Sequence, residues 1–179
     1  LFSQFSFEGL FLSDSKIPVS SLAAFKDMSV DLLDMSNNCI GDRVWEILNY
    51  ASRIQDLSLE NVCTNITNIT RNVELTSLSL EANYIKKLEA KDFAFANTLT
   101  SLILKNNLIE SIPKELGNFL DALTILDLSG NHIMMIYPED FEPFYRLEVL
   151  DLRDNRIQTL SSKLKPRFAN LTTLDLRRN

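Results

Sequence analysis

The sequence predicts a solenoid of stacked repeats, a fold of the α/β class in which each repeat contributes one short β-strand. Runs with the pattern L-x-x-L-x-L-x-x-N-x-L recur along the chain, and five of them open 24 residues apart. The run that opens at Leu99 continues with Leu102, Leu104, Asn107 and Ile109. Repetition at such a fixed period is typical of repeat architectures. These architectures have extended concave surfaces that bind partners.

Weaker copies of the pattern extend it towards the N-terminus. The repeats, numbered 1 to 8 here, open at Phe7, Val30, Ile54, Leu75, Leu99, Leu123, Leu147 and Leu171. The step from repeat 3 to repeat 4 is 21 residues instead of 24. The asparagine at position 9 of the pattern is replaced by Ser15 in repeat 1 and by Val62 in repeat 3. Alternate side chains of a strand share a face, so the apolar residues at positions 4 and 6 both point into a core. We therefore expect about eight strands.

The remaining repeat positions are assigned by the same reasoning. Position 9 turns inward, and a buried amide without hydrogen bonds costs free energy. The asparagine is therefore expected to pair with backbone groups at the bend between neighbouring repeats. Phe25, Phe93 and Phe141 recur near position 19 and are predicted to fill the return side of the core. Trp45 is expected on the same side.

The pattern resembles the leucine-rich repeat family over essentially the whole chain. Its length and the I-x-x-I/L run after the asparagine are similar to the typical subclass of animal extracellular proteins, such as Toll-like receptor ectodomains, Slit-type guidance proteins and secreted insect immune proteins. The resemblance implies a right-handed horseshoe with a concave parallel sheet and an irregular or short-helical convex side. It also implies innate immune recognition as the favoured process, and dimerisation, since Toll-like relatives often pair.

Composition and register predict a single solenoid domain over residues 1–179. The chain contains 4 glycines and 5 prolines and no low-complexity linker. No apolar run approaches the ~18 residues of a membrane helix, so no membrane insertion by this segment is expected. The net charge of −6 argues against a nucleic-acid partner. The chain begins and ends inside repeats without evident caps, which we interpret as a fragment or processed part of a longer protein.

Two cysteines, Cys39 and Cys63, occupy position 10 of adjacent repeats. Neighbouring strands lie ~4.8 Å apart, and a disulfide needs Cα atoms ~4.4–6.8 Å apart. An intrachain disulfide is therefore predicted, with two free thiols or a bridge to a partner chain as the alternatives. N-glycosylation sequences occur at Asn65, Asn68 and Asn170, away from the inner strand positions. Together these features indicate a secreted protein or the extracellular part of a membrane protein; chance sequences in an intracellular protein are the alternative.

Positions 3, 5, 7 and 8 are predicted to face the concave side. The candidate partner-binding residues on this side are Asp34, Glu60, Glu81, Ile103, Lys105, Asp127, Asp151, Arg153, Asp175 and Arg177. Stacked aspartates repel each other, and neighbouring arginines can offset this repulsion. The columns are thus either a compensated charge ladder or a charged docking strip that orients a partner. Ile103 is the candidate apolar contact.

Catalysis and metal binding are not expected. His132, the only histidine, has no neighbouring nucleophile and is predicted at the surface. Asp127, Asp151 and Asp175 project in parallel, whereas oxygen ligands of a metal converge. We expect no catalytic, cofactor-binding or metal site. The predicted function is extracellular recognition of a protein or glycoconjugate, including another repeat protein or a pathogen-derived ligand. An intracellular scaffold and an extracellular matrix or adhesion protein with the same fold are the alternatives.

Overall fold

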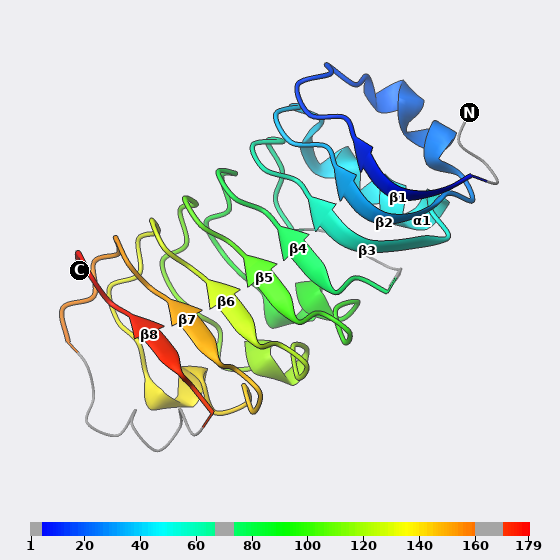
Figure 1. Ribbon diagram of the computed structural model, residues 1–179. Coiled ribbons are helices and arrows are strands. Elements are labelled where there is room, and N and C mark those ends of the chain that lie inside the picture. The colour runs from blue at the N-terminus through cyan, green and yellow to red at the C-terminus, as the bar shows by residue number, and fades with distance from the viewer. Residues whose placement is uncertain (1–4, 67–73, 160–169) are drawn as a thin grey trace.

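The computed structural model describes residues 5–66, 74–159 and 170–179 (Figure 1). Eight parallel strands form one open sheet, and each strand pairs with the next one in the chain. The strands are β1 (Ser6–Phe11), β2 (Ser29–Asp34), β3 (Arg53–Ser58), β4 (Ser77–Ser79), β5 (Ser101–Ile103), β6 (Ile125–Asp127), β7 (Val149–Asp151) and β8 (Thr173–Asp175). The predicted solenoid and its eight strands are therefore confirmed.

The pairing register confirms the repeat numbering. Position 4 of every repeat lies opposite position 4 of the next, from Leu10 opposite Leu33 to Leu150 opposite Leu174. The shorter step is accommodated without a slip, because Leu57 pairs with Leu78 across 21 residues. A shift by one residue would have moved every core side chain to the other face of its strand. Repeat 3 is three residues shorter than a standard repeat, and these residues are missing from the segment between β3 and β4, not from the strands.

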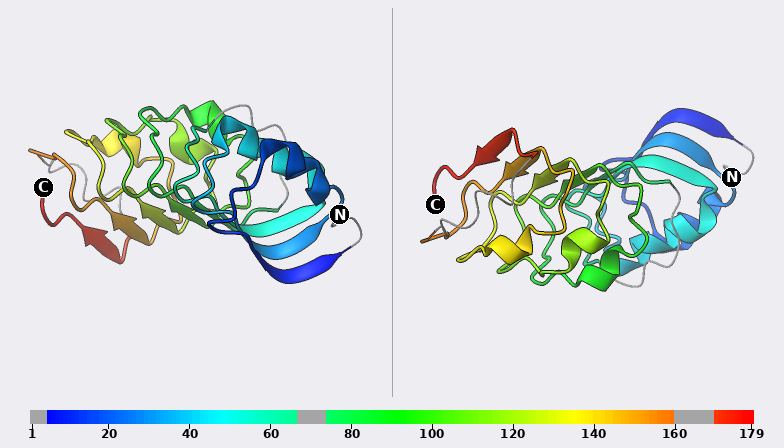
Figure 2. Two further views of the ribbon diagram at one scale, coloured as in Figure 1. Left: turned by 90° about the horizontal axis from the view of Figure 1, so that it is seen from above. Right: turned by 90° about the horizontal axis from the view of Figure 1, so that it is seen from below.

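Short helical segments lie on the side of the solenoid opposite the sheet, as Figure 2 shows. They are η1 (Val19–Phe25), η2 (Gly41–Trp45), α1 (Glu46–Tyr50), η3 (Ala90–Phe93), η4 (Leu116–Asn118) and η5 (Pro138–Asp140). The core lies between these segments and the sheet. Phe25, Phe93 and Phe141 are buried there, as predicted. Trp45 is also buried, and its indole Nε1 donates a hydrogen bond to the carbonyl of Asn65 at 2.7 Å.

The asparagines at position 9 form a ladder that links consecutive repeats and is buried except at Asn179. The Asn107 amide Nδ2 donates to the carbonyl of Leu104 in its own repeat at 3.0 Å and to that of Leu80 in the preceding repeat at 2.9 Å. Its Oδ1 accepts from the backbone N–H of Ile85 at 3.1 Å. The other members are Asn38, Asn83, Asn131, Asn155 and Asn179. The amide is thus satisfied by backbone groups of two repeats, as the sequence predicted.

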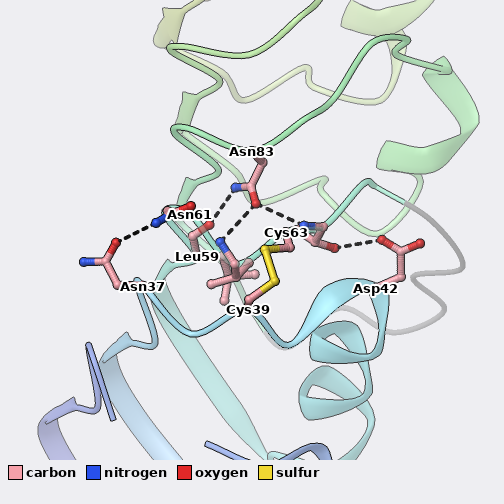
Figure 3. Close-up of a disulfide and its surroundings, with 9 residues drawn as sticks. Asn37, Cys39, Asp42, Leu59, Asn61, Cys63 and Asn83 are labelled. Atoms are coloured by element: carbon pink, nitrogen blue, oxygen red, sulfur yellow. Dashed lines mark hydrogen bonds between the residues drawn. A yellow bond between two sulfur atoms is a disulfide. The ribbon is translucent and has the colours of Figure 1, made fainter. Parts of the chain in front are cut away.

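Repeat 3 interrupts this ladder, since Val62 has no amide. The backbone N–H of Ile40, which the pattern would pair with an asparagine at position 62, donates instead to the carbonyl of Asn38 at 2.7 Å. At this place a disulfide joins Cys39 to Cys63, with the Cα atoms 5.1 Å apart (Figure 3). The predicted disulfide is therefore present, and it links the two repeats that the asparagine ladder leaves unlinked.

Candidate recognition surface

The ten candidate residues lie on the face of the sheet that is turned away from the core, which we call the inner face. Asp34, Ile103, Asp127, Asp151 and Asp175 each end a strand at position 5. Neighbouring strands place these ends side by side, with Ile103 opposite Asp127, then Asp151 and Asp175. The other five stand two residues later, at position 7: Glu60, Glu81, Lys105, Arg153 and Arg177. The structure thus assembles them into two adjacent columns.

The aspartates of position 5 have a role in the backbone that the sequence analysis missed. The Asp127 carboxylate accepts the backbone N–H of Ser129, two residues later, at 2.8 Å. The same contact occurs at Asp34, Asp151 and Asp175. Each carboxylate therefore satisfies an N–H group at the point where the strand ends and the chain turns. Aspartate is known to bond its own backbone in this way, so the repeated L-D-L sequence was the available signal.

The inner face carries compensated charge at its C-terminal end. Arg153 forms ion pairs with Asp151 at 2.5 Å and with Asp175 at 3.5 Å. Arg177 pairs with Asp175 at 2.5 Å. The Arg177 guanidinium, hydrogen bonded to the Asp175 carboxylate, lowers the pKa of Asp175 to about 2. The arginines therefore offset the repulsion between stacked aspartates, which is the charge ladder that the sequence analysis considered.

The N-terminal half of the inner face is acidic and largely uncompensated. Glu81 is paired with Lys105 at 2.7 Å. Among the described residues, Asp34, Asp56 and Glu60 form no ion pair. Asp56, at position 3, was not among the candidates, although this position was predicted to face inward. The charge of the inner face is thus distributed unevenly along the solenoid.

Position 8 adopts a left-handed backbone conformation in all eight repeats. The φ angles run from 51° at Asn61 to 67° at Gly130, through Asp14, Asn37, Ala82, Asn106, Asp154 and Arg178. Left-handed φ values are tolerated best by glycine, asparagine and aspartate, which explains the residues that dominate this position. The asparagines and aspartates there are therefore selected partly by the turn, and not only by a partner.

The glycosylation sequences lie outside the inner face where they are described. Asn65 is exposed, and its backbone N–H donates to the Asp42 carboxylate at 2.7 Å. Asn170 is exposed and precedes β8, and its amide Nδ2 donates to the carbonyl of Tyr145. Asn68 lies outside the described residues. Both described asparagines are thus exposed at the surface.

The described residues contain no group of three or more His, Cys, Asp or Glu side chains that could hold a metal ion. His132 is partly exposed, and its backbone N–H donates to the carbonyl of Ile109 at 2.9 Å. In the same part of the chain, no helix is both long and apolar enough to cross a bilayer.

Exposed apolar side chains that the sequence analysis did not single out lie between β6 and η5. They are Met134, Met135 and Tyr137.

Comparison with known proteins gives two kinds of match. The family model for the leucine rich repeat matches residues 73–133 and 121–179, more than half of the chain. The crystal structure of TLR13 in complex with ssRNA13 is similar, with a TM-score of 0.75 and 30% sequence identity over 89% of this chain. A repeat protein of Leptospira interrogans has a TM-score of 0.57 and 20% identity over 97% of this chain.

The chain spans only part of these relatives. It covers 23% of the TLR13 chain and 53% of the Leptospira chain. The latter likeness, at 20% identity, shows the fold alone. No curated protein matches the sequence.

Proposed function

The chain belongs to the leucine-rich repeat family, and we propose that it is an extracellular recognition module that binds a protein or glycoconjugate partner through its inner face, in innate immunity. The family and its structural neighbours are non-enzymatic recognition modules, so the chain is not an enzyme. The observation that carries the proposal is the inner face itself. Eight strand ends form one continuous surface, and six of them carry charged or polar side chains, the exceptions being Phe11 and Ile103. Such charge patterns orient partners and raise association rates.

The extracellular location is supported by covalent features. A disulfide joins Cys39 to Cys63, and such bonds persist in oxidising compartments. The exposed Asn65 and Asn170 lie in acceptor sequences for N-glycosylation. The similarity to TLR13 agrees with the resemblance to Toll-like receptor ectodomains, on which the proposed immune role and dimerisation rest.

The first test is a non-reducing peptide map of the protein from its native source, with and without enzymatic deglycosylation. We expect a peptide linked through Cys39 and Cys63, and sugar on Asn65, Asn68 or Asn170. Free thiols with bare asparagines would contradict the extracellular location and favour an intracellular scaffold. Binding to fibrous partners instead would favour a matrix protein.

The second test addresses the inner face. The variant Asp151→Asn/Arg153→Gln/Arg177→Gln removes charge, while asparagine keeps the oxygen that accepts the N–H of residue 153. We expect weaker capture of partners from extracellular fluid and cell surfaces, with a melting temperature within a few degrees of the parent. Unchanged capture would remove this part of the inner face from the site. The related TLR13 structure is a complex with RNA, so single-stranded RNA belongs among the ligands tested, although the net charge of −6 opposes it.

A further inference from the structure

We propose that the N-terminal half of the inner face binds an extended, arginine-rich segment of a protein partner, with its cationic side chains on Asp34, Asp56 and Glu60 and one guanidinium stacked on Phe11. This inference rests on the proposed function and specifies the partner's chemistry. The face is an open side of the sheet on which no other described segment packs (Figures 1 and 2). The carboxylates make this half of the face negative, so a positively charged segment is the complementary occupant.

The three carboxylates surround a small residue. Asp34 of β2 lies directly opposite Ser58 of β3, while Asp56 and Glu60 stand two residues before and after Ser58 on the same face. With strands ~4.8 Å apart and a rise of ~3.3 Å per residue, the Cα atoms of Asp34 and Asp56 are about 8 Å apart. The Ser58 hydroxyl is bonded to that of Ser36 at 2.9 Å.

These carboxylates retain oxygens for a partner. Asp34 Oδ1 accepts the N–H of Ser36 at 2.9 Å, and Asp56 Oδ1 accepts from the Thr76 hydroxyl at 2.9 Å. The second oxygen of each has no protein donor among the described residues. The Glu60 carboxylate forms no hydrogen bond or ion pair with a described residue. Arginine is favoured over lysine here because its planar fork of donors can pair with several carboxylate oxygens at once.

An exposed aromatic ring adjoins this group of carboxylates. Phe11 ends β1 directly opposite Asp34, and its side chain is 69% exposed. Its ring lies over Gly9, where an added Cβ would come within 2.9 Å of it. Phe11 also lines an open hollow of about 630 Å³ together with Glu8 and Leu32. A cation over the face of an aromatic ring is attracted by its quadrupole, so Phe11 and Asp34 offer both a stacking surface and a counter-charge for one guanidinium.

The experiment uses the full disulfide-bonded chain and synthetic peptides. The probe is a nine-residue peptide that alternates arginine with serine, and the control peptide has glutamate for arginine. Isothermal titration calorimetry is performed at 50 mM and 500 mM salt. We expect the arginine peptide to bind and the glutamate peptide not to bind. Binding should weaken at high salt because screening shortens the range of charge interactions.

Matched variants locate the binding site. Asp34→Asn/Asp56→Asn/Glu60→Gln removes three charges while leaving acceptor oxygens at all three positions, and should weaken binding about tenfold. Glu110→Gln/Glu115→Gln/Glu139→Gln removes three exposed charges outside the inner face and should leave binding unchanged. Phe11→Leu keeps an apolar side chain but removes the aromatic ring. It should weaken binding of the arginine peptide more than binding of its lysine analogue, because a planar guanidinium stacks on an aromatic ring and an ammonium does not.

Several outcomes would overturn the proposal. These are no binding of the arginine peptide by the parent, equal weakening by both triple variants, and competition by single-stranded RNA for the same residues. Failure of the wider function is distinguishable. If an extracellular partner is captured and the arginine peptide does not compete with it, the proposed recognition function stands and the inferred chemistry is wrong.

Discussion

Removal of the disulfide should loosen the N-terminal repeats selectively, because the bond replaces a missing member of the asparagine ladder. Elsewhere the ladder ties each pair of repeats through a position-9 amide, but Val62 offers none between repeats 2 and 3. The bond between Cys39 and Cys63 joins these two repeats. Asp42 adds a smaller link, accepting from the Asn65 N–H and the Thr64 hydroxyl. The variant Cys39→Ser/Cys63→Ser removes only the covalent link.

The magnitude follows from the loop that the disulfide closes. The two cysteines are 24 residues apart, and the chain-entropy model assigns such a loop roughly 3.5 kcal/mol. Since each 1.4 kcal/mol is a factor of ten, the opening equilibrium should shift by roughly 300-fold. In a solenoid each repeat contacts only its neighbours. The opening should therefore be concentrated in repeats 1 and 2 rather than spread over the chain.

Hydrogen exchange followed by mass spectrometry measures this local opening. Amides of β1 and β2 should exchange faster in the double-serine variant, while amides of β5 to β7 keep their protection. Adding Val62→Asn should restore part of the protection in repeats 1 and 2. An asparagine there can accept the N–H of Ile40 and donate to the carbonyls of Met35 and Leu59, as Asn107 does for its own repeats.

Val62→Ser is the matched control, since it is polar but too short to bridge the repeats. Restoration by serine equal to that by asparagine would refute the idea that the disulfide stands in for an amide. Uniform loss of protection over all repeats would refute the local opening itself.

Three further predictions concern the core, the turns and the charge ladder. Leu126→Ala should lower the free energy of unfolding by ~2–5 kcal/mol, because Leu126 is fully buried at position 4; an unchanged denaturation midpoint would contradict the register. Gly130→Ala should destabilise by ~1–2 kcal/mol or more, since its φ is 67° and a Cβ would come within 2.3 Å of Asn106 Oδ1. Ala82→Gly, at the same repeat position with φ 54°, should stabilise, and opposite signs in urea unfolding are the check. The Asp175 pKa of about 2 lies below the ordinary ~3.9, so its contribution to stability is complete above about pH 4 and is lost as pH falls towards 2. Carboxyl NMR titration should show this pKa rising in Arg177→Gln, and an unmoved pKa would remove Arg177 as its cause.

The fold could be predicted from the sequence because its strongest determinants repeat. Position 4 and position 6 leucines recur often enough to fix the strands, the register and the buried face, even where repeat 3 is shortened. The amides of position 9 were predictable for the same reason, since a polar residue between buried ones must find backbone partners. Repetition provides several independent observations of each position, and this compensates for weak copies such as the one that opens at Phe7.

The details of the inner face were less predictable, because a polar residue there can be required by the backbone turn or by a partner, and the sequence does not separate these two reasons. Aspartate at position 5 accepts a backbone N–H, and position 8 requires a left-handed conformation. Both constraints arise where a strand turns into the next segment, so neither appears in a pattern of apolar residues. The ion pairs of Arg153 depend on rotamers that the sequence does not specify.

The backbone contacts at the strand ends separate residues that the fold requires from residues that it leaves free to vary. A residue that the turn requires, such as Asp127, would recur at position 5 whether or not a partner exists. Within the described part of the chain, the carboxylates of Asp56 and Glu60 make no such backbone contact, and Phe11 replaces the aspartate of later repeats with an exposed ring. Neither the core nor the turn accounts for these choices. Departures from the repeat pattern on an exposed face are therefore better candidates for recognition than the pattern itself.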